Sequence, residues 1–220
     1  MKYFGLAKLR YISLTKRLKL IHLFSLFVFL GLCFSTFLLS LETVVVFVIC
    51  GIITFLYAVP FIPRTIMLDK TNNLREIGGL KIYVIALIWT VVVVVIPIID
   101  SGVIIGLKLW ITFMQRFLFI LALMIPFEIR DMNYDSIRLA TLPQKIGIYK
   151  TKVLGLLFLL GFVILEYFKP IFNQQYFIVY FTIALLTIYL ILNAKQKQSP
   201  YYSSFWVESL PIVWLFLYLV

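Results

Sequence analysis

Three carboxylates stand close together in one short segment and are the strongest candidates for chemistry in this chain. They are Glu128, Asp131 and Asp135, and the whole 220-residue sequence has only nine acidic residues. On a helix these positions fall at roughly 0°, 300° and 340° around the axis, so they form a single stripe. Such a stripe can hold a hard divalent cation and, through it, phosphate oxygens. The other interpretation is a solvated helix end, in which Arg130 and Arg138 form weak local salt bridges.

The composition predicts that this stripe belongs to an integral membrane protein. The chain is 63% hydrophobic and 13% charged, whereas a soluble domain is roughly half apolar and a quarter charged. No water-soluble fold can hide so much apolar surface, so we expect a chain embedded among membrane lipids, in the inner (plasma) membrane of the cell. The net charge of +11 fits Lys and Arg gathered in cytoplasmic loops. No basic soluble module is present, so nucleic acid is not an expected partner.

Seven apolar runs come close to the ~20 residues that a membrane-spanning helix needs. The predicted fold class is therefore all-α, a polytopic membrane helical bundle of about seven transmembrane helices that forms one domain over residues 1–220. One run contains Val91 to Val95, which would indicate a strand in a soluble protein. In lipid it must be helical, because an open strand leaves its backbone groups unpaired. The approximate spans are 18–41, 44–62, 80–99, 109–127, 153–168, 177–192 and 202–220.

The basic residues predict the orientation of these spans. Seventeen of the twenty Lys and Arg residues fall in the N-terminal segment or in alternate loops. The opposite loops hold only Lys108 and Lys169, and Arg116 lies within a span. Because cytoplasmic loops collect positive charge, we expect the N-terminus inside the cell and the C-terminus outside. The carboxylate stripe then lies on the cytoplasmic side, and Pro126 marks a break in the helix just before it.

The stripe is part of a longer motif. Residues 128–135 read Glu-Ile-Arg-Asp-x-x-x-Asp, and residues 140–147 read Ala-Thr-Leu-Pro-x-x-Ile-Gly. This pattern resembles the second aspartate-rich motif of UbiA-type intramembrane prenyltransferases. Residues 56–64 and 74–83 are similar to that family's Tyr-Ser-Leu-Pro segment and to the Gly-Leu-Lys sequence that starts its next helix. The resemblance covers most of the chain from about Leu18 onward, and its motif positions are Ile129, Arg130, Asp131, Asp135, Thr141, Leu142, Pro143 and Gly147.

The resemblance implies an all-helical membrane bundle around a cavity that is open to the cytoplasm and to lipid. It also implies magnesium-dependent transfer of a prenyl group from a prenyl diphosphate to an acceptor, often an aromatic one. Asp131 and Asp135 would be the catalytic residues. Mg²⁺ would be held by Glu128, Asp131 and Asp135. The diphosphate would be bound by Arg130, Arg138 and Lys145.

The departures from the family pattern are equally specific. Family members have an earlier Asn-x-x-x-Asp-x-x-x-Asp motif on an N-terminal helical hairpin, but here no Asp precedes Asp69. Glu128 stands where Asp is usual, and Ala140 replaces a basic residue. The missing hairpin would lie upstream of Met1, belong to a partner chain, or be lost altogether. In the last case the alternative function is a non-catalytic membrane protein of the same fold that binds an isoprenoid lipid or a partner.

Other polar and aromatic residues admit two interpretations each. Asp69 and Glu76 lie on the same side as the stripe, but Asn72-Asn73 favours a solvated loop there. Arg116 within a span indicates function, or it extends its charge toward the membrane surface. Glu166 and Glu208 are interpreted as interfacial. Four aromatic residues could stabilise a carbocation through their ring faces, namely Tyr57, Trp89, Phe127 and Tyr134. Packing is the commoner role for such residues.

Overall fold

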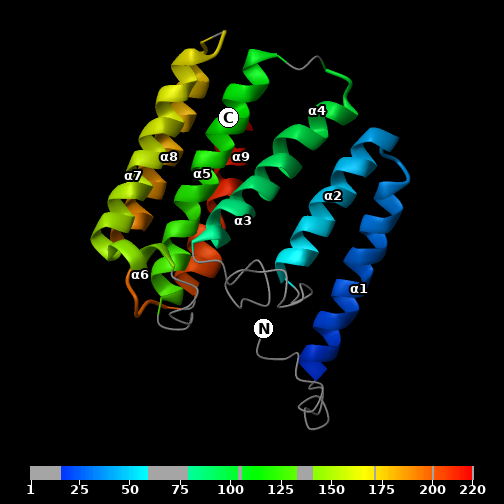
Figure 1. Ribbon diagram of the computed structural model, residues 1–220, viewed down its shortest axis with the longest axis horizontal. Helices are drawn as coiled ribbons and strands as arrows, with labels where there is room; N and C mark the ends of the chain where they lie inside the picture. The colour runs from blue at the N-terminus through cyan, green and yellow to red at the C-terminus, as the bar shows by residue number, and fades with distance from the viewer. Residues whose placement is uncertain are drawn as a thin grey trace, which may run out of the picture. The chain divides into compact units, whose positions relative to one another are not determined.

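The computed structural model describes residues 16–58, 79–103, 106–132, 141–170, 172–199 and 201–219. Every regular element within these ranges is a helix, which confirms the predicted all-α fold class (Figure 1). The chain forms two compact units, Met1–Val44 and Val45–Val220. Helix α1 (Lys16–Thr36) lies in the first unit, and α2 (Leu41–Ala58) begins there and continues into the second. Ser40 caps α2, because its hydroxyl oxygen accepts a hydrogen bond of 3.3 Å from the Thr43 backbone N–H.

Five helices in the second unit are long and apolar enough to cross a membrane, as predicted for an integral membrane protein. The apolar parts of α1 and α2, Leu20–Thr36 and Leu41–Tyr57, are shorter. Three of the five are built from more than one helical element, and the short α6 (Leu142–Ile146) joins two of them. The five are Leu80–Asp100 (α3 Leu80–Thr90, η3 Val91–Val95, α4 Ile96–Asp100), α5 (Leu107–Asp131), Ile148–Phe168 (α7 Ile148–Ile164, η5 Leu165–Phe168), α8 (Gln174–Asn193) and Tyr202–Leu219 (η6 Tyr202–Val207, α9 Leu210–Leu219).

Helix α5 is the central element of this unit. It packs against α3, α7 and α8, and Figure 1 shows it between α3 and α7. Its buried residues Phe119, Ala122, Ile125 and Ile129 form one side of the main core, which α7, α8 and α9 complete. A smaller cluster, in which Leu121 is buried with residues of α3, covers another side. A side chain on α5 is therefore held by neighbours around most of the helix.

Two glycines allow α7 to approach its neighbours closely. A Cβ at Gly155 would lie 3.1 Å from Ile125 Cγ1 of α5 and 3.1 Å from Ile191 Cδ1 of α8. A Cβ at Gly161 would lie 3.0 Å from Leu118 Cδ1. Small residues at such positions bring helix backbones together, and this packing is a main source of association between helices in lipid.

The run of five valines is helical, which confirms the prediction that lipid excludes a strand here. Val91–Val95 forms a π-helical segment inside the span Leu80–Asp100. The Ile96 backbone N–H donates to the Val91 carbonyl, five residues back. Pro97 follows and has no N–H to offer the preceding turn, which explains why the regular hydrogen-bond pattern shifts at this point.

The predicted break at Pro126 is wrong. Helix α5 continues through Pro126 as far as Asp131, because a single proline removes only one intrahelical hydrogen bond and the surrounding chain can compensate. The carbonyl of Pro126 accepts a hydrogen bond of 3.4 Å from Gln198 Nε2. Glu128 and Asp131 consequently belong to the last turns of a membrane-length helix rather than to a loop.

Candidate functional site

A cluster of four charged residues, the α5-end cluster, consists of Lys81, Glu128, Arg130 and Asp131. Lys81 Nζ lies 3.0 Å from Glu128 Oε1 and 3.9 Å from Asp131 Oδ2. Arg130 Nε lies 2.8 Å from Asp131 Oδ1. The Glu128 side chain is only 2% exposed, whereas that of Asp131 is 26% exposed. Two carboxylates, one nearly buried and one accessible, therefore share a single ammonium group.

The helix arrangement explains why these residues meet. Lys81 is in the first turn of α3, which begins directly after Gly79 in a left-handed conformation (φ 83°). Helices α3 and α5 run antiparallel, so the start of α3 lies beside the end of α5. Glu128 and Asp131 are three positions apart and lie on one helical face, as predicted. Arg130 donates to Asp131 from outside this face, and its Cζ lies 5.2 Å from the Phe127 ring centroid.

Of the remaining predicted site residues, the structure describes Lys145 but neither Asp135 nor Arg138. Asp135 and Arg138 lie outside the described residues, as do Asp69 and Glu76. Lys145 is in α6 and is exposed. Within the described parts of the chain, no group of three or more His, Cys, Asp and Glu residues is placed to hold a metal ion. The described structure thus brings together Glu128, Asp131 and Arg130 of the predicted set.

The donor set of the α5-end cluster suits magnesium. Mg²⁺ in proteins is commonly bound by one or two carboxylates together with phosphate oxygens and water. Oxygens of Glu128 and Asp131 lie 3.0 Å and 3.9 Å from the Lys81 ammonium, so both carboxylates face the same cationic group. From the sequence, Lys81 has no predicted role in the site, because its proximity to Glu128 depends on the pairing of α3 with α5.

The Thr-Leu-Pro-x-x-Ile-Gly part of the motif builds a single helical turn. Thr141 caps α6, and its backbone N–H donates to Gln144 Oε1 at 3.0 Å. Gln144 Nε2 in turn donates to the Met132 carbonyl at 3.0 Å, which ties this turn to the end of α5. Gly147 has φ 81° between α6 and α7, a conformation that favours glycine. These motif positions therefore have a structural role beside the α5-end cluster.

A second polar cluster, the Glu166 network, is buried in the bundle and was not predicted. Glu166 lies near the end of the span Ile148–Phe168, as predicted, but it is 1% exposed, so its carboxylate faces the inside of the bundle. Its Oε2 accepts hydrogen bonds from Lys169 Nζ at 2.5 Å and from Gln115 Nε2 at 2.9 Å. Lys169 Nζ also lies 3.3 Å from the Tyr180 hydroxyl oxygen. The spacing of Glu166 and Lys169 was the available signal, since residues three apart on a helix can pair.

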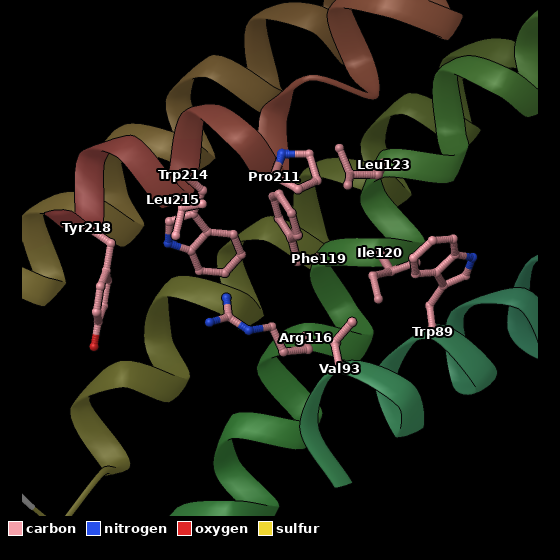
Figure 2. A pocket seen from close by; sticks show the side chains of 10 residues that line it. All are labelled: Trp89, Val93, Arg116, Phe119, Ile120, Leu123, Pro211, Trp214, Leu215 and Tyr218. Carbon is pink, nitrogen blue, oxygen red and sulfur yellow. The ribbon is translucent and has the colours of Figure 1, made fainter. Parts of the chain in front are cut away.

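A pocket of about 370 Å³ lies between α3, α5 and α9. Figure 2 shows Arg116 of α5 reaching toward Trp214 of α9, with Trp89 on the opposite wall. The Arg116 Cζ lies 3.7 Å from the Trp214 ring centroid and 5.8 Å from that of Tyr180. Of the four aromatic candidates, Trp89 lines this pocket, Phe127 lies beside Arg130, Tyr57 belongs to α2, and Tyr134 is outside the described residues.

No family model matches the chain, and neither a curated protein nor a solved structure matches it. The assignment of function therefore depends on the motif residues and on the geometry of the α5-end cluster.

Proposed function

We propose that this protein is a UbiA-like membrane prenyltransferase relative that binds a prenyl diphosphate at the Asp131 end of α5 and transfers its prenyl group to an acceptor. One observation supports this most directly. Glu128 and Asp131 converge on one cation at the end of a membrane-length helix. A diphosphate can be held there at the membrane surface while its apolar chain extends into the bundle.

Each charged residue has a role in this proposal. Glu128 and Asp131 would hold Mg²⁺, with Asp135 as a further ligand. Bound Mg²⁺ would coordinate the diphosphate oxygens and stabilise the charge of the leaving group. Arg130, Arg138 and Lys145 would supply positive charge around the departing diphosphate. Lys81 would exchange its contact with the carboxylates for one with the anionic substrate.

The proposal includes the membrane topology. Seven spans, with the N-terminus in the cytoplasm and the C-terminus outside, would place the α5-end cluster on the cytoplasmic side of the inner membrane. The carboxylates at this end form one wall of a diphosphate site, and two metal ions on a diphosphate would need ligands from a second wall. We therefore expect slow turnover by the 220-residue chain alone, and faster turnover when the N-terminal hairpin of the family is supplied.

The contacts of Lys81 support a second candidate function. Its ammonium lies 3.0 Å from the nearly buried Glu128 carboxylate, so this acidic residue already has a cationic partner. A chain in which Lys81 serves as a permanent counterion would keep the fold without binding Mg²⁺. Such a protein would bind an isoprenoid lipid or a partner chain and would release no diphosphate.

The two candidate functions are distinguished by measuring the binding of radiolabelled geranyl diphosphate to the full chain in phosphatidylcholine nanodiscs. Under the prenyltransferase proposal, binding requires Mg²⁺, and Asp131→Asn weakens it about tenfold or more because a charged ligand is lost. Glu128→Gln should act in the same direction. Glu208→Gln is the matched control, because Glu208 is exposed and lies outside the cluster. Binding that survives chelation of Mg²⁺ and is unchanged by Asp131→Asn would support the non-catalytic function.

A further inference from the structure

The pocket beside Arg116 is separate from the α5-end cluster. Arg116 and Glu128 are twelve residues apart on α5, which corresponds to about 18 Å along the helix axis. Between them, the buried residues Ile82, Ala86 and Leu121 fill the contact between α3 and α5. The pocket lining combines aliphatic and aromatic side chains with Arg116 as its charged residue. Its volume of about 370 Å³ is in the range of sites that bind small molecules.

The position of Arg116 along α5 places its side chain within the hydrocarbon region when α5 spans a membrane. It is nine residues from Leu107, the start of α5, which places it about 14 Å along the helix axis. Helix α5 is about 37 Å long, and the hydrocarbon core is about 30 Å thick. If α5 spans this core, Arg116 is at least about 6 Å inside it. A guanidinium at such depth is costly and usually faces a partner or a polar cavity.

Within the described chain, this charge makes close contacts with aromatic rings. The guanidinium lies against the Trp214 ring and near the Tyr180 ring. Among the described residues, no carboxylate lies within ion-pairing distance of Arg116. Glu166 of the nearby network is already paired with Lys169. A guanidinium that stacks on a ring keeps its N–H edge available, and this edge can bind a carboxylate through two parallel hydrogen bonds.

The rim of the pocket is open on the outer surface of the second unit. Trp89 is 58% exposed and Leu215 is 57% exposed, whereas Trp214 at the base is 7% exposed. Figure 2 shows the pocket between the helices that carry these residues. An apolar molecule can therefore pass sideways from lipid toward the Arg116 side chain.

From these observations we propose that the Arg116 pocket binds a single-chain amphiphile with a carboxylate, such as a long-chain fatty acid. The carboxylate pairs with the Arg116 guanidinium, and the hydrocarbon chain lies along the apolar wall toward Trp89 and Val93. A carboxylate is favoured over a lipid phosphate for two reasons. The phosphate of phosphatidic acid carries up to two negative charges and is attached to two hydrocarbon chains. The pocket has a single cation and is too small for two chains.

The test uses quenching of tryptophan fluorescence by 9,10-dibromostearate. The protein is the full chain in phosphatidylcholine nanodiscs, with Trp110→Phe and Trp206→Phe so that Trp89 and Trp214 of the pocket remain. We expect saturable quenching by the acid and only linear, non-saturable quenching by its methyl ester. Arg116→Gln should weaken the saturable component about tenfold or more, since a charge-assisted bidentate contact is lost.

Two further variants keep the proposal open to refutation. Val93→Phe fills part of the pocket from its rim and leaves Arg116 in place, so it should also abolish saturable quenching. This variant tests the site independently of whether Arg116→Gln folds. Lys108→Gln removes an exposed charge from the same helix and should leave quenching unchanged. Equal quenching by acid and ester, or unaltered binding by Val93→Phe, would refute the site. Saturable quenching by a brominated phosphatidic acid at the same affinity would refute the choice of a carboxylate.

Discussion

At the scale of single residues, the two most buried carboxylates of the described chain, Glu128 and Glu166, each pair with a lysine. Glu128 of α5 pairs with Lys81 of α3, and Glu166 pairs with Lys169 while accepting from Gln115 of α5. The sequence predicted that Glu128 and Asp131 share one helical face, because that depends only on helix periodicity. It could not reveal Lys81 as their partner or the burial of Glu166, because both depend on how neighbouring helices are rotated against each other.

The Glu166 network allows a prediction about stability. Glu166→Gln should leave the Lys169 ammonium, whose side chain is 9% exposed, without its anion. Breaking a buried pair from one side costs about 3–5 kcal/mol, so the unfolding free energy in detergent micelles should fall by that order. The double variant Glu166→Gln/Lys169→Met removes both charges and should recover much of the loss.

The exposed Glu208 supplies the control for this measurement. Glu208→Gln should change the unfolding free energy by less than about 0.5 kcal/mol, because surface substitutions have small effects. If Glu166→Gln were as stable as Glu208→Gln, the ion pair with Lys169 would not contribute to folding. A double variant no more stable than Glu166→Gln would show that the two charges are not coupled.

At the scale of elements, hydropathy was a good guide to where helices occur and a poor guide to where they end. The run Val91–Val95 was predicted to be helical from the requirement that backbone groups pair in lipid, and it is. Helix α5 continues past Pro126 to Asp131, whereas the predicted span ended at residue 127. Proline was interpreted as an end signal, but it removes only one hydrogen bond of the helix, and α5 continues through it with Ile125 and Ile129 packed in the main core.

Close packing of α7 against α5 and α8 should depend on Gly155. Gly155→Leu places a side chain where even a Cβ would lie 3.1 Å from both Ile125 and Ile191. Overpacking of this kind costs about 1–3 kcal/mol, so the unfolding free energy should fall by a similar amount. Gly51→Leu in α2 is the control, since nothing lies within 4 Å of a Cβ at that position. Equal stability of the two variants would mean that α7 can shift away from α5 without loss.

At the scale of the whole molecule, the alternation of helix directions separates the charges. In the second unit, Lys81 lies beside the end of α5, and Lys152 near the start of α7 donates to the Leu192 carbonyl near the end of α8. These ends carry most of the unit's basic residues, whereas Lys108 and Lys169 belong to the opposite ends. The all-α fold class followed from composition. The Arg116 pocket did not, because it requires the placement of α3, α5 and α9 together.

This arrangement leads to a test of the orientation with single cysteines. Cys33 and Cys50 are the two native cysteines, and both are replaced by Ser. Ser101→Cys then places a thiol in the turn before α5, and Lys150→Cys places one near the start of α7, both at exposed positions. Because basic ends face the cytoplasm, a membrane-impermeant maleimide should label position 101 on intact cells. It should label position 150 only after permeabilisation.

Full labelling of both thiols in detergent confirms that each is accessible. The opposite pattern, with position 150 labelled on intact cells and position 101 protected, would place the α5-end cluster outside the cell. Glu128 and Asp131 would then face a compartment away from a cytoplasmic prenyl diphosphate, and the proposed transferase function would fail. The Arg116 pocket would be unaffected, because a fatty acid reaches it from lipid whichever way the bundle faces. The labelling pattern therefore separates the two proposals at the level of the whole molecule.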